Sequence, residues 1–176
     1  MTVTLTQASV QQEPILQNLM QFYTHDFSAF WAGTSRGDLA ADGRFEAYPM
    51  ADYWSRPGWS AQLIWQDGVL AGFALVNDQS HSGAPVQSSV AEFFILRKHR
   101  GGGVGREAGE MMFSQRPGSW EVAVARKNIR ALAFWRRTIL GSGRANEVSE
   151  SDVSDAHWNG PILRFLWAGQ EGDMST

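Results

Sequence analysis

Residues 90–106 of the sequence read VAEFFILRKHRGGGVGR, and this stretch decides the fold. The part from 90 to 96 is apolar except for Glu92, a composition that is typical of a strand buried on both faces in the middle of a sheet. A short basic link then leads to three consecutive glycines and to Val104-Gly105-Arg106, where a helix is expected to begin. The stretch therefore predicts a central strand that passes through a glycine loop into a helix.

The segments before this strand carry three clear signals. Residues 3–7 alternate weakly and predict a first strand. Glu13-Pro14 places a proline where the first turn of a helix tolerates it, and the following apolar residues recur at spacings of three and four, which predicts one buried stripe. Asp67-Gly68 separates two apolar runs and predicts a tight hairpin. The predicted stripe consists of Ile15, Leu16, Leu19, Met20, Phe22 and Tyr23.

The segments after the glycine loop predict a helix over 107–114, a strand over 120–124, a helix from Asn128 to Gly141 and a last strand over 161–167. Residues 33–58 are irregular and long enough to favour a functional loop or a short extra helix, and we expect one side of a binding site there. The whole order predicts an α/β fold with a mixed, mostly antiparallel central sheet flanked by helices.

Length and composition limit the class of protein. A chain of 176 residues with 43% hydrophobic residues suits one domain, which we place at 1–168, with a polar, fraying tail at 169–176. The net charge of −3 without a basic stripe argues against nucleic acid. The absence of cysteine excludes disulfides and a cysteine nucleophile. No leader or apolar span is recognisable, so we expect a cytoplasmic protein without a membrane partner, and a homodimer stays open.

The glycine loop has the chemistry of an anion site. Glycines let a backbone approach a ligand closely, and the unpaired N–H groups at the start of a helix favour phosphate oxygens. A plain glycine turn is the simplest alternative. Residues 103–108 also satisfy the dinucleotide fingerprint, although an early βαβ unit is missing and Glu121 is only an approximate ribose-binding acid. The Lys-Ser or Lys-Thr ending of a P-loop is absent from the sequence.

Four features together resemble the Gcn5-related N-acetyltransferase (GNAT) family, and within it the group described only as predicted acetyltransferases. They are the apolar strand with its short charged link, the element Arg100-x-x-Gly103-x-Gly105, the downstream Asn128, and Phe134-Trp135. The resemblance covers nearly the whole domain, and the Arg-x-x-Gly-x-Gly element is its most specific part. It implies an acyltransferase that uses acetyl-CoA and acts on an amine acceptor, without a metal.

The resemblance also implies which residues bind acetyl-CoA. The pantetheine arm would pair with the backbone of the strand, and the loop would hold the pyrophosphate. Asn128 matches a position that often reaches the pantetheine or the thioester, and its other interpretation is a helix cap. The implied cofactor-binding residues are Phe93, Phe94, Ile95, Arg100, Gly101, Gly102, Gly103, Val104, Gly105, Arg106 and Asn128.

Acyl transfer to an amine needs a base, and Glu92 is the first candidate. A desolvated carboxylate has a raised pKa and can accept a proton near neutral pH. The alternative is that Glu92 is salt-bridged or faces a wet edge. Glu121 is the second candidate, by its match to the catalytic Glu of some family members. For the departing thiolate, Trp135 stands where many members have a tyrosine, so water, Tyr23, Tyr53 or no protein acid serves that step.

Two rival functions follow from these observations. The first is a non-catalytic acyl-CoA-binding or sensing module, and the second is a nucleotide-binding oxidoreductase. The four histidines lack metal-ligand spacing. Aromatic residues between 22 and 59 either line an acceptor pocket, with Glu46 or Asp52 attracting a cationic amine, or belong to the core. This aromatic set is Phe22, Tyr23, Phe27, Phe30, Trp31, Tyr53, Trp54 and Trp59.

Overall fold

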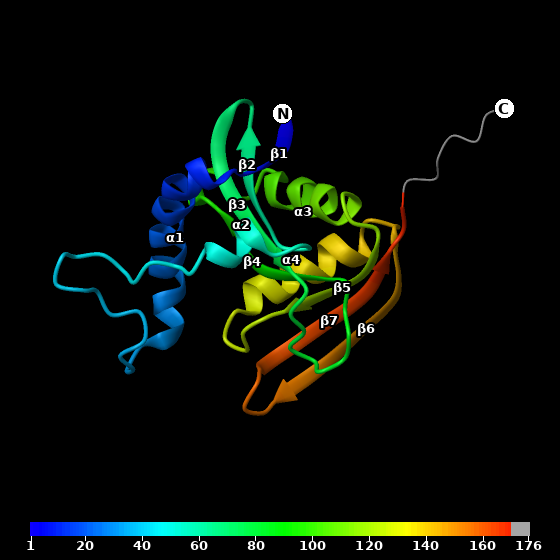
Figure 1. Cartoon of the computed structure of the whole chain (residues 1–176). Coiled ribbons are helices and arrows are strands. Elements are labelled where there is room, and N and C mark those ends of the chain that lie inside the picture. The colour runs from blue at the N-terminus through cyan, green and yellow to red at the C-terminus, as the bar shows by residue number, and fades with distance from the viewer. Residues whose placement is uncertain (170–176) are drawn as a thin grey trace. The chain divides into compact units, whose positions relative to one another are not determined.

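The structure is a computed structural model that describes residues 1–169 (Figure 1). Its strands form one seven-stranded sheet in the order β1-β2-β3-β4-β5-β7-β6, and the pair β4–β5 is parallel. The predicted mixed, mostly antiparallel sheet flanked by helices is confirmed. The strands are β1 (Val3–Gln7), β2 (Ser60–Gln66), β3 (Val69–Asn77), β4 (Ser88–Ile95), β5 (Gly118–Ala123), β6 (Ala145–Ser154) and β7 (Asn159–Trp167).

The helices begin and end close to the predicted positions. They are α1 (Glu13–Ser28), α2 (Ala51–Ser55), α3 (Val104–Ser114) and α4 (Ile129–Leu140), with short 3-10 turns η1 (Val10–Gln12), η2 (Ala29–Trp31) and η3 (Arg97–His99). The irregular segment 33–58 therefore contains a short extra helix, α2. Within residues 1–169, none of the helices combines the length and the apolar character that a membrane span needs.

The chain groups into two compact units. The first consists of residues 1–75 and 92–104, and the second of residues 76–91 and 105 onward. One domain over 1–168 stays a prediction. The fraying tail predicted for 169–176 falls, apart from Gly169, outside the described residues.

The first unit contains β1, α1 and the β2–β3 hairpin. β1 pairs with β2 in antiparallel register, with Val3 opposite Gln66. Asp67 and Gly68 have φ of 50° and 78°, which confirms the predicted tight turn. The predicted stripe of α1 is wrong for Phe22, which is 57% exposed. Because each helical residue turns by about 100°, Phe22 falls on the side opposite the buried Met20.

The second unit has an aromatic core beneath β5 and β7. Phe113 of α3 contacts the rings of Trp120 and Trp167 at 4.9 Å each, and all three side chains are almost fully buried. The abundance of tryptophan thus reflects core packing here. β6 was not predicted, because its sequence ANEVSESDVS is mostly polar and exposed. It pairs along β7 in antiparallel fashion, with a bulge between Asn146 and Ser149 (Figure 1).

Candidate active site

The glycine loop follows β4 directly. η3 turns the chain after Ile95, and α3 begins at Val104, whose side chain is buried. Gly101 and Gly103 have φ of 84° and 91°, values that residues other than glycine rarely adopt. A Cβ atom added at Gly101 or Gly102 would meet nothing within 4 Å. The glycines therefore allow the turn and leave space beside the backbone for a ligand.

The two arginines of the link are held by one carboxylate of α1. Asp26 accepts from Arg97 Nη2 at 2.6 Å and from Arg100 Nη2 at 2.7 Å, and these bonds hold the pKa of Asp26 below its ordinary value despite partial burial. Arg100 Nε also donates to the carbonyl of Ile95 at 2.7 Å. The guanidinium of Arg100, predicted to bind the cofactor, is therefore engaged in fixing the loop to α1 and to the end of β4.

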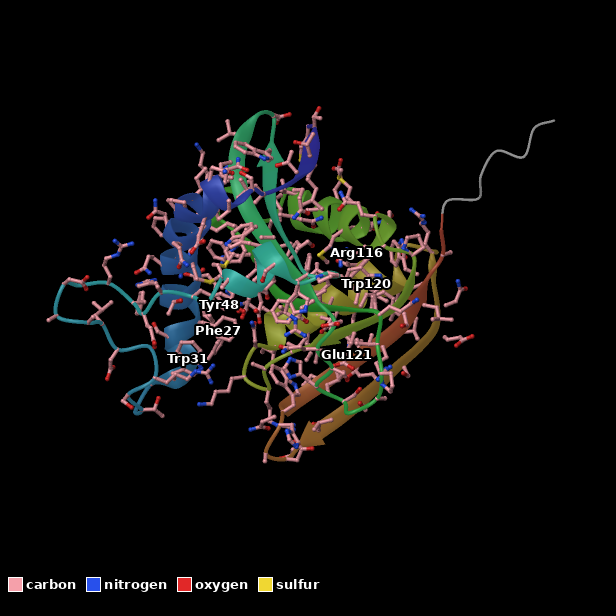
Figure 2. The ribbon with its side chains drawn as sticks, in the orientation of Figure 1. Phe27, Trp31, Tyr48, Arg116, Trp120 and Glu121 are labelled. Atoms are coloured by element: carbon pink, nitrogen blue, oxygen red, sulfur yellow. The ribbon has the colours of Figure 1, made fainter. Side chains whose placement is uncertain are left out.

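Glu92 is the centre of a polar cluster in the first unit. The hydroxyl of Tyr23 donates a short hydrogen bond to Glu92 Oε2, and Tyr48 is a second phenol close enough to lower the pKa of the same carboxylate. The rings of Tyr48 and Tyr53 have centroids 6.4 Å apart, so all three tyrosines of the sequence lie in one cluster. Figure 2 shows Tyr48 beside α1. The predicted salt bridge of Glu92 is not seen, since none of the ion pairs in the described part of the chain involves it.

The protonation state of Glu92 suits a base. Desolvation by burial raises its pKa from 4.5 to about 7, although the hydrogen bonds from Tyr23 and Tyr48 and the charge of Arg36 act in the opposite direction. The residue is nevertheless partly accessible to solvent. Burial and the neighbouring carboxylate raise the pKa of Tyr23 well above 10, so its phenol stays protonated. The cluster can therefore accept a proton near neutral pH through Glu92.

The aromatic residues that the sequence suggested for an acceptor pocket fall mainly into two groups. Tyr23, Phe27 and Trp31 form a row along α1 and η2, with successive ring centroids 5.0 and 5.5 Å apart. Figure 2 shows Phe27 and Trp31 on this row. The other group packs around α2, where Tyr53 is buried against Trp59, and Trp54 Nε1 donates to Glu13. The row on α1 and η2 adjoins Glu92 through Tyr23. The group around α2 packs in the core, which was the other interpretation of the aromatic residues.

The two acids expected to attract a cationic amine lie elsewhere in the first unit. Glu46 lines a surface pocket of about 490 Å³ together with Glu13, Asp42 and Arg44. Asp52 forms an ion pair with Arg56 at 3.6 Å. No contact with Glu92 is seen for either, so the structure gives this expectation no support.

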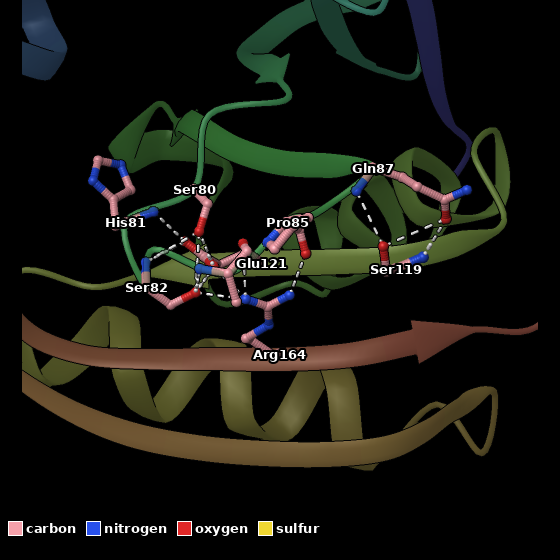
Figure 3. Close-up of polar contacts among 9 residues, drawn as sticks. Ser80, His81, Ser82, Pro85, Gln87, Ser119, Glu121 and Arg164 are labelled. Atoms are coloured by element: carbon pink, nitrogen blue, oxygen red, sulfur yellow. Dashed lines mark hydrogen bonds and ion pairs between the residues drawn. The ribbon is translucent and has the colours of Figure 1, made fainter.

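Glu121 lies in the second unit and is completely buried (Figure 3). Its carboxylate accepts from the backbone N–H of His81 at 2.5 Å, from the hydroxyls of Ser80 and Ser82, and from Arg164 Nη1 at 3.4 Å. Arg164 in turn donates to the carbonyl oxygens of Ala84 and Pro85. These bonds tie the segment between β3 and β4 to β5 and β7, so the oxygens of Glu121 are occupied by structural partners.

Asn128 and Trp135 also lie in the second unit. Asn128 Oδ1 accepts from the backbone N–H of Ala131 at 3.2 Å, which is the geometry of a helix cap on α4. Trp135 is 5% exposed and contacts the ring of Phe113, and a Cβ added at Gly109 of α3 would lie 3.4 Å from its indole. The indole therefore packs between helices, in place of the tyrosine expected from the family.

The predicted site residues are thus distributed over the two units. Glu92, the strand 93–95 and the loop 100–104 belong to the first, and residues 105, 106, 121 and 128 belong to the second. Sequence reasoning missed Asp26, Arg36 and Tyr48, because a single charged or phenolic residue in an irregular segment has no motif around it. Among residues 1–169, no group of three potential ligands could hold a metal ion.

Comparisons with known proteins bear on the fold. No family model and no curated protein matches the sequence. Solved acetyltransferase structures do match the coordinates. They include the PaiA N-acetyltransferase of Thermoplasma acidophilum in complex with coenzyme A, with a TM-score of 0.60 and 12% identity over 95% of this chain and 100% of that chain. Another is the diaminobutyrate acetyltransferase EctA of Paenibacillus lautus in complex with diaminobutyric acid and coenzyme A. Its TM-score is 0.57, with 12% identity over 94% of this chain and 95% of that chain.

A third match is the ribosomal-protein-S18-alanine N-acetyltransferase of Escherichia coli, with a TM-score of 0.56 and 13% identity over 99% of both chains. Structures described as GNAT proteins are also among the matches. At these low identities the likeness shows the fold. The chain therefore has the fold of GNAT acetyltransferases, as its resemblance to that family implied.

Proposed function

We propose that the protein is an acetyl-CoA-dependent N-acetyltransferase in which Glu92 accepts a proton from the amine of the acceptor. The observation that carries the proposal is the partly accessible carboxylate of Glu92, which has a pKa of about 7 and accepts a hydrogen bond from Tyr23. Glu92 lies in β4, the strand that leads to the glycine loop. Two structural neighbours that contain coenzyme A support the choice of donor.

The loop residues fit the phosphates of acetyl-CoA. Gly101 and Gly102 leave open space beside the backbone, and the first N–H groups of α3 follow at Val104, Gly105 and Arg106. The backbone of Phe93, Phe94 and Ile95 would hold the pantetheine arm, and Asn128 would either approach that arm or serve only as a cap. When bound, acetyl-CoA supplies the activated acetyl group.

Glu92 has the decisive chemical task. The nitrogen of an amine attacks only when its lone pair is free, so a proton has to leave it before or during attack. Tyr23 orients the carboxylate through its hydrogen bond, and Tyr23 and Tyr48 both stabilise its negative charge. Direct transfer to the acceptor agrees with a sequence without cysteine. Glu121 is the less suitable base, because its carboxylate oxygens are bonded to Ser80, His81, Ser82 and Arg164.

Glu92→Gln tests this role because it keeps the shape of the side chain and removes the base. General-base catalysis contributes on the order of 10²–10⁴-fold, so kcat should fall by about that factor while the affinity for acetyl-CoA stays within about twofold. Activity is followed by release of free CoA with a panel of amines. Normal turnover by Glu92→Gln at every pH would contradict the proposal.

One observation favours a second candidate function. Trp135 replaces the tyrosine expected from the family and packs in the core, so no acid is contributed from that position. A non-catalytic acyl-CoA-binding module would bind acetyl-CoA normally and show no release of CoA with any amine. Calorimetric titration with acetyl-CoA, CoA and NAD identifies a nucleotide-binding oxidoreductase if NAD binds and CoA does not. If acetyl-CoA binds, the amine panel then separates the enzyme from the non-catalytic module.

A further inference from the structure

Arg36 is an exposed cation that forms no ion pair with an acid of the described residues. Its guanidinium lies over the ring of Trp31, 4.3 Å from the centroid. None of the ion pairs formed within residues 1–169 involves Arg36. A second arginine in the same unit makes a useful contrast, since Arg56 lies 4.6 Å over Trp59 but also pairs with Asp52 at 3.6 Å. Arg36 therefore keeps its hydrogen-bond donors available on a fixed, stacked guanidinium.

The aromatic row connects Arg36 to Glu92. Tyr23, Phe27 and Trp31 follow one another at intervals of four residues, so they lie along one face of α1 and η2. All three are partly exposed, which leaves aromatic surface for a ligand. Tyr23 bonds Glu92 at one end, and Trp31 carries Arg36 at the other.

The charge of Arg36 is also close enough to affect the groups at the other end. It lowers the pKa of Glu92 and of Tyr23 in opposition to the larger effect of burial. The face therefore presents a proton acceptor, an apolar surface and a positive charge along one row of α1 and η2.

We propose that the face formed by Tyr23, Phe27, Trp31 and Arg36 binds the acceptor, and that the acceptor is a small amino carboxylate with an aromatic or other apolar side chain. Its carboxylate would bind the planar guanidinium of Arg36, a geometry that favours two parallel hydrogen bonds. Its side chain would pack on Phe27 and Trp31, and its amine would meet Glu92. The inference rests on the proposed function, because it assigns the acceptor of that reaction.

This arrangement also selects against other amines. A polyamine or a lysine side chain would place a second cation near Arg36, where like charges repel. The sequence suggested that Glu46 or Asp52 attracts a cationic amine, and no contact of either acid with the row is seen among the described residues. The specificity of the face thus comes from a positive charge where the sequence suggested a negative one.

The test is direct binding of two matched probes to the full chain loaded with CoA. L-Phenylalanine and L-phenylalaninamide share an amine and an aromatic ring and differ in the carboxylate. At about pH 6 both amines are protonated, so calorimetry compares the carboxylate alone. We expect the acid to bind at least about tenfold more tightly than the amide, as one charge-assisted contact allows. Arg36→Gln should remove this preference.

Arg56→Gln is the matched control, because it removes an arginine stacked on tryptophan at a position that does not adjoin the row. It should retain the preference for the acid. Equal affinity of the two probes, no binding of either, or a preference that survives Arg36→Gln would overturn the inference. The proposed function fails separately: in the wild type, a lack of acetyl-CoA binding, or acetylation of phenethylamine that is unchanged in Glu92→Gln, would contradict it whatever the two probes show.

Discussion

The hydroxyl of Tyr23 donates a hydrogen bond to the carboxylate of Glu92, although the two residues are 69 positions apart in the sequence. The contact joins α1 to β4, the strand that precedes the glycine loop. It places a titratable carboxylate where burial raises its pKa to about 7 and a neutral phenol holds its orientation. The pH dependence of both activity and stability should therefore depend on this pair.

Activity should rise with pH through the pKa of Glu92. A base works only when it is unprotonated, so below about pH 7 the rate with a bound acceptor should fall about tenfold per pH unit, and above it the rate should level off. Steady-state kcat measured from pH 5 to 9 tests this. In Glu92→Gln the remaining slow kcat should no longer rise with pH through about 7. If kcat of that variant still rose with the same pKa, the titrating group would be a residue other than Glu92.

Stability should change with pH in the opposite direction. The pKa of Glu92 is raised on folding, so the folded state binds the proton more tightly, and the stability that this contributes is complete below the unfolded pKa near 4.5 and lost as pH rises through about 7. The change amounts to about 3 kcal/mol at most. Denaturant unfolding of the wild type and of Glu92→Gln from pH 4 to 9 measures it, since the difference between the two isolates Glu92 from other titrating groups.

Tyr23→Phe should move the activity limb upward. The hydrogen bond from Tyr23 lowers the pKa of Glu92, so its removal leaves desolvation less opposed and raises that pKa above 7. The variant should therefore lose activity at neutral pH and recover part of it at about pH 9, where the carboxylate ionises again. A uniform loss at all pH values would indicate that Tyr23 matters for packing or as a proton donor instead.

The sequence predicts those parts of the fold and the site that local patterns encode. The hairpin at Asp67-Gly68 and the glycine loop after Ile95 depend on backbone conformations that few residues adopt, so the residues themselves reveal them. β6 escaped prediction because its pairing with β7, not its own polar sequence, makes it a strand. Tyr48 escaped for a related reason, since its contact with Glu92 depends on how the segment before α2 returns along α1.

Two glutamine side chains of α1 hold the segment around residues 45–48 against the helix. Gln17 exchanges hydrogen bonds with the backbone of Tyr48 at 2.8 and 3.1 Å, and Gln21 does the same with Phe45 at 3.2 and 2.8 Å. Polar helix positions of this kind carry no signal by themselves, because glutamine on a helix is usually solvated. The position of Tyr48 is therefore a long-range property that only the folded chain expresses.

Gly101→Ala should weaken the binding of acetyl-CoA by about tenfold or more. A Cβ at Gly101 imposes strain of about 1–2 kcal/mol at φ 84° and projects into the open space beside the loop. Gly58→Ala is a matched control, because Gly58 also has φ 84° and nothing within 4 Å of an added Cβ, but lies outside the loop. Both variants should lose similar stability, and calorimetry should show weaker binding only for Gly101→Ala. Equal affinities would remove the loop from the cofactor site.

Glu121→Gln should destabilise the protein by about 3–5 kcal/mol. The substitution leaves Arg164, whose side chain is 24% exposed, without its buried carboxylate and disturbs the bonds to the segment around Ser82. The exposed pair Arg126–Asp152 gives the contrast, and Asp152→Asn there should change the free energy of unfolding far less. Denaturant unfolding measures both, and kcat is compared under conditions where the variants stay folded. If Glu121→Gln kept its stability and lost turnover, Glu121 and not Glu92 would be the base.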